Sequence, residues 1–382
     1  MRSFFNTVSN YKYSVVFLLI IILTAFVRVW DSDNGRVARE KKITFRSVTS
    51  EDNLFSNLKK FEKYFNKTFP FRQNLLSFNN YIHIKSFGIS PVDRVTVGKN
   101  GWLYLKKLNE RSDNVDYSVT IDKFSDEELK KWFQIFNERN NWLEKEGIYL
   151  LVVIVPNKSS IYSEFLPDNI RKLNRSVRTD QFVKYFNENS DIDVLDLRKD
   201  LNNLKDKKIL YHKTDSHWNH YGAWIGYNAI VEHLAKIFTG ISSIPYEKFP
   251  KKIRKRNSNS DLASMLALQK SIYKEKGKRL FFPKGINISQ KKINGFKYRK
   301  IKNSYSVCKE GKLPKIVMIH DSFGLRLKKY MSASSSEIIY LLDWGFNLFP
   351  EFIKQEKPEI VIYEIAERFL YRPFFLKSSI NN

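Results

Sequence analysis

Two short polar segments contain the side chains that could carry out nucleophilic catalysis. In the first, TDSHWN, Asp215 and His217 lie two residues apart. Residues i and i+2 of an extended loop point to the same side, so the carboxylate can hold the imidazole through its Nδ1–H. The Nε2 atom would then be free to act as a base. In the second segment, HDSFG at 320–324, Ser322 is a candidate nucleophile.

The predicted surroundings of Ser322 suit such a role. The apolar run KIVMIH at 315–320 predicts a buried strand, and a helical segment is expected from Phe323. Ser322 would then lie at the carboxyl edge of a sheet and beside a helix amino terminus, where backbone N–H groups favour a developing oxyanion. This resembles a nucleophile elbow, although the Gly-x-Ser-x-Gly pattern is absent. The structural alternatives are that Ser322 only caps the helix and that His217 is a loop histidine hydrogen-bonded to backbone groups.

A metal site is the competing chemical interpretation of the same region. His212, His217 and His220 cluster around Asp215, and zinc can be held by three such ligands with one open position. The spacing fits no helical i,i+4 pair, and HExxH is absent, so we expect no metal. Glycine-rich phosphate loops are also absent, so we expect no cofactor. The single cysteine, Cys308, excludes an intramolecular disulfide, a CxxC pair and a cysteine-based zinc site.

Helices and strands alternate along the part of the chain that must position these residues. Ser125 and Glu128 form a capping box, followed by an apolar stripe at helical spacing that includes Trp132. Asn219 is expected to cap a second helix, and Asn100-Gly101 marks a hairpin turn. Continuous apolar runs, typical of strands buried on both faces of a parallel sheet, predict the strands at 149–155, 193–197, 315–320, 338–342 and 359–365. The pattern predicts an α/β fold with a doubly wound, mostly parallel sheet.

The uncharged apolar run from Tyr13 to Val27 predicts an amino-terminal membrane helix. No small-x-small cleavage site follows it, which favours an uncleaved anchor over a cleavable signal peptide. We therefore expect an anchor at 1–30, a linker at 31–50 and a globular body at 51–376. More Lys and Arg residues follow the run than precede it, so the positive-inside rule by itself would place the body in the cytoplasm.

The chain is strongly basic, with 66 Lys+Arg and 40 Asp+Glu among 382 residues and a formal charge of +26. Its 42% hydrophobic content excludes intrinsic disorder as a whole. Residues 247–315 hold 21 Lys+Arg and 4 Asp+Glu, a net of +17, and are expected to form an insertion in the sheet. No strong nucleic-acid-binding motif is present, so an anionic polymer or anionic lipid headgroups are the expected partners, with compositional bias as the alternative.

Several segments between about residues 50 and 370 resemble the SGNH-hydrolase-like polysaccharide O-acetyltransferases of the AlgX/AlgJ group and their PatB-type cell-wall relatives. The most specific are YHKTDSHWNHYGA at 211–223 and HDSFG at 320–324. The others are FPFR at 69–72, VGKNGWLYL at 97–105, VIVPNKSSIY at 153–162, SDLASMLAL at 260–268 and VIYEIAERFL at 361–370. In ordinary SGNH hydrolases the serine block comes first. Here it comes late, as in this group, so the resemblance implies an SGNH-hydrolase-like fold with a permuted motif order.

The resemblance implies a catalytic triad of Ser322, His217 and Asp215. It further implies an extracytoplasmic O-acetyltransferase that forms a serine acetyl-enzyme and acetylates hydroxyls of a cell-envelope or exported polysaccharide. A membrane-bound O-acyltransferase would be its partner and acetyl source. The body would then be periplasmic or extracellular, against the positive-inside count. A carbohydrate acetyl esterase with the same triad and a non-catalytic binding protein are the alternatives.

The resemblance leaves the oxyanion donors open. The serine block often begins with glycine in SGNH enzymes, whereas His320 stands there in this chain. The backbone N–H of Ser322 is the first candidate donor, and Asn219 and Arg368 are possible side-chain donors. Trp218 is a candidate for stacking on sugar rings, with core packing as the alternative.

Overall fold

The computed structural model describes residues 72–106, 123–171, 177–257, 260–293 and 301–370. The chain divides into two units, Met1–Asn79 and Asn80–Asn382. Of the first unit, only the start of helix α3 (Arg72–Phe87) is described. None of the helices in the described part of the chain combines the length and apolar character needed to cross a membrane. The predicted anchor and linker, residues 1–50, lie outside the described residues.

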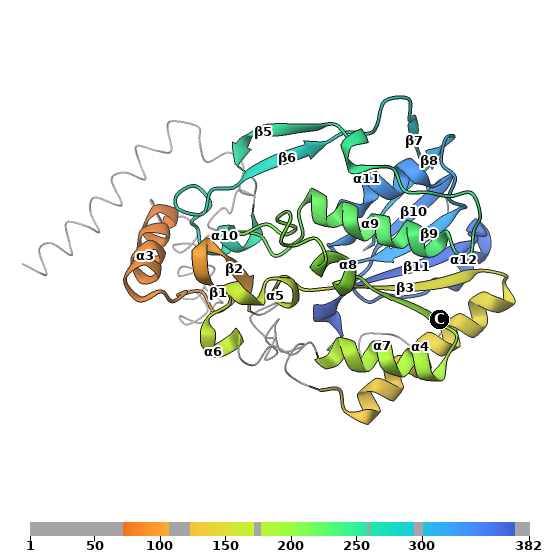
Figure 1. Ribbon diagram of the computed structural model, residues 1–382, viewed down its shortest axis with the longest axis horizontal. Coiled ribbons are helices and arrows are strands. Elements are labelled where there is room, and N and C mark those ends of the chain that lie inside the picture. The colour runs from red at the N-terminus through yellow and green to blue at the C-terminus, as the bar shows by residue number, and fades with distance from the viewer. Residues whose placement is uncertain (1–71, 107–122, 172–176, 258–259, 294–300, 371–382) are drawn as a thin grey trace, which may run out of the picture. The chain divides into compact units, whose positions relative to one another are not determined.

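A seven-stranded sheet forms the centre of the second unit, in the order β4-β3-β11-β9-β10-β8-β7 (Figure 1). Five neighbouring strands are parallel and correspond to the five predicted apolar runs: β4 (Asp193–Asp196), β3 (Tyr149–Val155), β11 (Ile360–Ala366), β9 (Ile316–His320) and β10 (Glu337–Leu342). β3, β9 and β11 are almost completely buried, as expected for strands covered on both faces. The predicted α/β fold with a mostly parallel sheet is confirmed.

The helices begin where the capping residues predict. Ser125 Oγ accepts the Glu128 N–H at 3.1 Å and Glu128 Oε2 accepts the Ser125 N–H at 3.0 Å, which starts α4 (Asp126–Lys145). Asn219 Oδ1 accepts the N–H groups of the first turn of α9 (His220–Leu234). Figure 1 shows α4 and α7 (Val177–Asn189) on one side of strand β3 and α9 and α11 (Gly324–Ser334) on the other.

Short elements connect this framework. Asn100 and Gly101 have φ angles of 54° and 77° in the turn between β1 (Val95–Val97) and β2 (Leu103–Leu105), so the predicted hairpin is present. The remaining short helices are η1 (Lys99–Gly101), α5 (Lys158–Ile161), η3 (Ser163–Phe165), α6 (Asp168–Arg171), α8 (Arg198–Asn202), η4 (Tyr246–Lys248), α10 (Asp261–Met265), α12 (Pro350–Glu356) and η5 (Glu367–Phe369).

The basic segment 247–315 is only partly separate from the sheet, which differs from the expected insertion. Its strands β7 (Ile288–Lys291) and β8 (Lys302–Cys308) extend the sheet as two antiparallel strands. Its strands β5 (Lys251–Asn257) and β6 (Lys276–Leu280) pair with each other as a two-stranded ribbon. These strands carry many exposed polar side chains and lack a continuous apolar run, so the sequence pattern did not reveal them.

Candidate active site

The structure brings together the three side chains that the sequence singled out. Asp215 Oδ1 lies 2.8 Å from His217 Nδ1, and His217 Nε2 lies 2.8 Å from Ser322 Oγ. Ser322 lies 105 residues beyond His217 in the chain. The resulting hydrogen-bond chain places a base against a candidate nucleophile and an acid behind the base.

The acid/base loop, residues 212–217, contains Asp215 and His217 and is stabilised by a hydrogen bond to its own aspartate. Asp215 Oδ1 also accepts the backbone N–H of His217 at 3.0 Å, which turns both side chains to the same side as predicted. Burial alone would raise the pKa of Asp215, but the hydrogen bond from His217 and the positive charges of His217 and Arg326 hold that pKa well below its ordinary value. Asp215 is therefore a carboxylate that can stabilise a positively charged imidazole.

The turn that carries Ser322 is clamped by the aspartate before it. Ser322 lies between the last residue of β9 and the start of α11. Asp321 is fully buried, and its Oδ1 accepts the Phe323 N–H while its Oδ2 accepts the Ala366 N–H, both at 2.7 Å. Its side chain thus ties the serine turn to the end of strand β11. Burial raises the pKa of Asp321 above its ordinary value.

A second buried acid, Glu364 on β11, holds the same turn. Its Oε2 accepts the N–H groups of Asp321 at 3.2 Å and Gly324 at 3.0 Å. Burial, followed by the negative charge of Asp321, raises the pKa of Glu364 well above its ordinary value. Sequence reasoning missed both acids as supports of the turn. The available signal was an acidic residue within one apolar strand segment, Glu364, and another directly after a second, Asp321, because a buried acid needs hydrogen-bond partners.

His320 lies behind the serine turn, in the position where SGNH enzymes often have glycine. Its ring is fully buried, and its Nδ1 donates to the Asp321 carbonyl at 2.6 Å. Burial lowers the pKa of His320 to about 4, so this histidine is neutral at ordinary pH. A Cβ at Gly324 would lie 2.6 Å from the His320 ring. The start of α11 therefore needs glycine because the imidazole fills the space beside it.

Aromatic side chains form the floor of the site. The rings of His217 and Phe323 lie 4.9 Å apart between centroids. Trp218 Nε1 donates to the Phe323 carbonyl at 3.1 Å, and the Trp218 side chain is fully buried. Trp218 therefore packs in the core and is not available to stack on a sugar, so the packing alternative is correct.

The two possible side-chain oxyanion donors differ in position. Asn219 uses its Oδ1 to cap α9 and its Nδ2 to donate to the Ile209 carbonyl at 2.7 Å, so its amide is engaged elsewhere. Arg368 is buried, and its guanidinium carbon lies 5.0 Å from the Phe323 ring centroid. Its Nε donates to Asn157 Oδ1 at 3.1 Å. Arg368 is thus close to the serine turn, whereas Asn219 belongs to the helix.

The three clustered histidines do not converge on one point. His212 Nδ1 lies 2.7 Å from Glu275 Oε1, and His220 Nε2 donates to the Lys278 carbonyl at 3.1 Å. Among the residues that the structure describes, the compact group of possible metal ligands is instead Asp215, His217 and Asp261, with ligand atoms within 4.8 Å of one another. Two of these are already hydrogen-bonded to each other.

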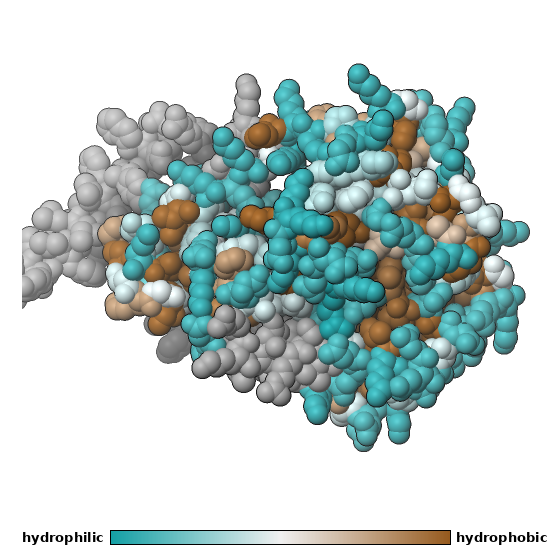
Figure 2. Space-filling view, in the orientation of Figure 1, coloured by the Kyte–Doolittle hydropathy of each residue, from teal (hydrophilic) through white to brown (hydrophobic). Residues whose placement is uncertain are grey.

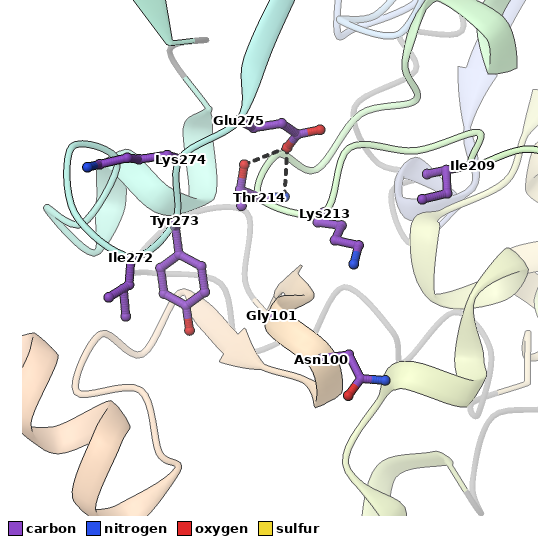
Figure 3. Close-up of a pocket in the computed structure, with 9 residues that line it drawn as sticks. All are labelled: Asn100, Gly101, Ile209, Lys213, Thr214, Ile272, Tyr273, Lys274 and Glu275. Carbon is purple, nitrogen blue, oxygen red and sulfur yellow. Dashed lines mark hydrogen bonds between the residues drawn. The ribbon is translucent and has the colours of Figure 1, made fainter.

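A pocket of about 330 Å³ lies beside the loop that precedes His217 (Figure 3). Its lining comes from three segments that meet there, and includes Asn100, Gly101, Lys213, Thr214, Tyr273 and Glu275. Thr214 Oγ1 donates to Glu275 Oε2 at 2.7 Å and fixes one wall. Figure 3 shows the Lys213 ammonium and the Tyr273 hydroxyl pointing into the space between the segments.

The buried amine of Lys158 stabilises the acid/base loop through hydrogen bonds to its backbone carbonyls. Its Nζ donates to the backbone carbonyls of His212 at 3.0 Å, Lys213 at 3.2 Å and Asp215 at 2.8 Å. Burial lowers the pKa of Lys158 to about 7, although the nearby carboxylates of Asp261 and Asp215 raise it. Three carbonyls of one loop thus share a single donor, which sequence reasoning missed because a lysine is ordinarily exposed.

We expect Lys158→Met to lower both stability and activity. The substitution leaves three carbonyls without their donor, so the free energy of unfolding should fall by about 3 kcal/mol. Release of the loop should also move Asp215 and His217 and lower the rate of reaction with a small acetyl ester. Denaturant unfolding and ester kinetics measure the two effects. Lys205→Met is the matched control, because the hydrogen bonds of Lys205 Nζ go to the Ile161 carbonyl of α5 and to the Glu164 carboxylate rather than to the loop. Wild-type values in both measurements would refute this role.

A Ser–His–Asp hydrogen-bond chain occurs on several unrelated folds, so the family is identified from the sequence of the whole domain. The family model described as "SGNH hydrolase-like domain, acetyltransferase AlgX" matches residues 95–341, and the chain belongs to this family.

A curated relative and two solved structures are similar to this chain. The probable alginate O-acetylase AlgJ of Pseudomonas aeruginosa is 25% identical over 228 residues, which cover 54% of this chain and 50% of the relative. The chain thus spans about half the length of this relative. Bacillus cereus PatB1 has a TM-score of 0.51 at 15% identity, covering 73% of this chain and 98% of that one. A DHHW family protein from Eubacterium siraeum has a TM-score of 0.51 at 14% identity, covering 72% and 94%. These two likenesses concern the fold.

Proposed function

We propose that this protein moves an acetyl group through an acetyl-enzyme at Ser322 onto hydroxyls of a cell-envelope or exported polysaccharide. The observation that carries the proposal is the continuous hydrogen-bond chain from Asp215 through His217 to Ser322. It occurs in a chain of an acetyltransferase family whose curated relative is named a probable alginate O-acetylase.

In the first step, His217 Nε2 takes the proton of Ser322 Oγ, and the oxygen attacks the carbonyl carbon of an acetyl donor. The negative charge on the carbonyl oxygen is stabilised by the Ser322 N–H and the amino terminus of α11. The protonated His217 then gives its proton to the leaving group, and the acetyl ester of Ser322 remains. Asp215 holds the imidazole and stabilises its charged form.

In the second step, a sugar hydroxyl gives its proton to His217 and attacks the acetyl carbon. The bond to Ser322 Oγ breaks, and the serine oxygen regains its proton from His217. Water in place of the sugar would make the protein an esterase, which is the alternative function. The pocket beside Lys213 and Tyr273 adjoins the acid/base loop and supports an acceptor that binds the catalytic domain itself.

The fate of the acetyl group tests the transferase against the esterase. The protein is incubated with a small activated acetyl ester and an oligosaccharide, and acetylated sugar and free acetate are measured together. A transferase should yield acetylated sugar that rises with acceptor concentration while free acetate falls. Acetate release that does not change with acceptor concentration would support the esterase instead.

We further propose an anchor at 1–30, a linker at 31–50 and a catalytic domain at 51–376 outside the cytoplasm. The apolar run at 13–27 and the membership of the AlgX family support this arrangement. The acetyl donor would come from a membrane-bound O-acyltransferase. Protease added to spheroplasts should degrade the body, and its protection would overturn the proposed orientation.

The ribbon of β5 and β6 supports an anionic polymer as substrate. Lys252 lies directly opposite Arg279, and like charges in such a cross-strand pair are destabilising unless an anion lies near them. Figure 2 shows mostly hydrophilic side chains in the region of the ribbon, with a hydrophobic group among them. The ribbon is attached near the site, because His220 at the start of α9 donates to the Lys278 carbonyl.

We expect Lys252→Gln with Arg279→Gln to weaken reaction with an anionic polymer but not with a small acetyl ester. The attraction should also weaken with salt, since the Debye length falls from about 10 Å at 0.1 M to about 3 Å at 1 M. The measurement is the ratio of polymer activity to ester activity at low salt. Lys130→Gln with Lys145→Gln removes two exposed charges from α4 and is the control. An unchanged ratio in the ribbon variant would leave the ribbon without a role in substrate capture.

A further inference from the structure

Helix α10 packs against the acid/base loop through its first residue, Asp261. The Asp261 N–H donates to Asp215 Oδ2 at 3.1 Å. In return, Asp261 Oδ1 accepts the Ser216 N–H at 2.8 Å, and Asp261 Oδ2 accepts the Ser216 hydroxyl at 2.5 Å. Asp261 thus bonds to both residues that precede His217, although it lies about 45 positions further along the chain.

The Nδ1 side of His217 consequently faces two carboxylates. Asp215 Oδ1 is the hydrogen-bond partner at 2.8 Å, and Asp261 Oδ2 lies at 3.6 Å. Ser216 Oγ lies 3.3 Å from the same nitrogen and 2.5 Å from Asp261 Oδ2. Because the Ser216 hydroxyl donates its proton to Asp261, a lone pair of its oxygen is left toward the imidazole N–H.

We propose that Asp261 is a second carboxylate of the acid/base system, which positions His217 through Ser216 and stabilises the imidazolium that forms in each step. The proposal rests on the proposed function, since it concerns the same histidine. Asp261 does not contact the reacting atoms, so it is a positioning residue.

The charges around His217 explain why a second carboxylate matters. An opposite charge within about 4–6 Å favours the charged form of a titratable group. Positive charges also act here, because Arg326 on α11 influences Asp215 and Lys158 on α5 bonds to the loop. The titratable and charged groups that act on the loop, on His217 or on their buried neighbours include Asp215, Lys158, Asp321, Arg326, Arg368, His220 and Glu275. Loss of Asp261 leaves this balance more positive and the imidazolium less stable.

The test is Asp261→Asn, assayed with a small acetyl ester across a range of pH. Asparagine can keep the hydrogen bond from the Ser216 N–H but removes the charge. We expect kcat/KM to fall about tenfold and the acid-side midpoint of its pH profile to move down by about one pH unit. The midpoint moves down because a less stable imidazolium loses its proton at a lower pH. The neutral, basic form of the histidine is then present at lower pH than in the wild type.

Two further variants separate charge from structure. Asp261→Glu keeps the charge and should keep the wild-type acid-side midpoint, even if the rate falls; it also serves as the test if the asparagine variant does not fold. Asp193→Asn removes another carboxylate that faces a histidine, His233, away from the site, and should leave the profile unchanged.

The outcomes are distinct. A lower rate in Asp261→Asn with the wild-type midpoint would show a structural role only and overturn the proposal, as would a shifted midpoint in Asp261→Glu. Intact-mass analysis of the wild-type protein with the ester distinguishes failure of the proposed function from failure of the role of Asp261. Without an acetyl adduct on Ser322, the proposed function itself fails. With the adduct present, kinetics of Asp261→Asn that match the wild type at every pH would refute the second carboxylate alone.

Discussion

Ser322→Ala is expected to abolish both the acetyl-enzyme and acetyl transfer. The substitution removes the oxygen that attacks the donor, and loss of the nucleophile from a triad lowers kcat by about 10⁴-fold or more. Intact-mass analysis after incubation with an activated acetyl ester should show one acetyl adduct in the wild type and none in the variant. The acetyl content of the cell-envelope polysaccharide should fall in cells that carry only the variant.

The fold should survive this substitution. The serine turn is held by the Asp321 and Glu364 carboxylates through backbone N–H groups, and Ser322 Oγ takes no part in those bonds. Thermal unfolding of Ser322→Ala should therefore match the wild type. An acetyl adduct that persists in a folded Ser322→Ala protein would contradict the assignment of the nucleophile.

His217→Ala is expected to be as severe as loss of Ser322, and Asp215→Asn to be milder. His217 transfers the proton in both steps, whereas Asp215 orients the ring and stabilises its charge. We expect at least about a tenfold difference in kcat between the two variants. Kinetics with a small acetyl ester at one fixed pH measure this order.

A matched control is His233→Ala, which removes a histidine that also faces a carboxylate, that of Asp193. Its kinetics should equal those of the wild type, because neither residue belongs to the site. If Asp215→Asn proved more damaging than His217→Ala, the proton transfer assigned to His217 would be wrong.

Local patterns in the sequence were sufficient to predict the helices, turns and buried strands that surround the site. The capping box at Ser125, the cap at Asn219 and the hairpin turn at Asn100 depend on residues within about four positions of one another, so they can be read from the chain directly. Buried parallel strands such as 149–155 are also evident, because both of their faces must be apolar. The edge strand β7 and its neighbour β8 were not predicted, because both carry many exposed polar side chains that obscure the alternating pattern.

The Asp215–His217 pair was also evident from its spacing, and the partner Ser322 was suggested by its place after a strand together with the family resemblance. The structure places the three in contact, while their catalytic role remains a prediction to be tested as above.

The supports of the site depended on the tertiary structure. Lys158 reaches the acid/base loop, Glu364 reaches the serine turn, and Asp261 reaches His217 across separations of about 40 residues or more. Such contacts are set by the order of strands in the sheet and by the packing of α10, which no short sequence window contains. Polar residues in buried positions look unfavourable by themselves. Lys158 and Glu364 are buried, and partners from distant segments satisfy them once the parallel strands cross over to their neighbours.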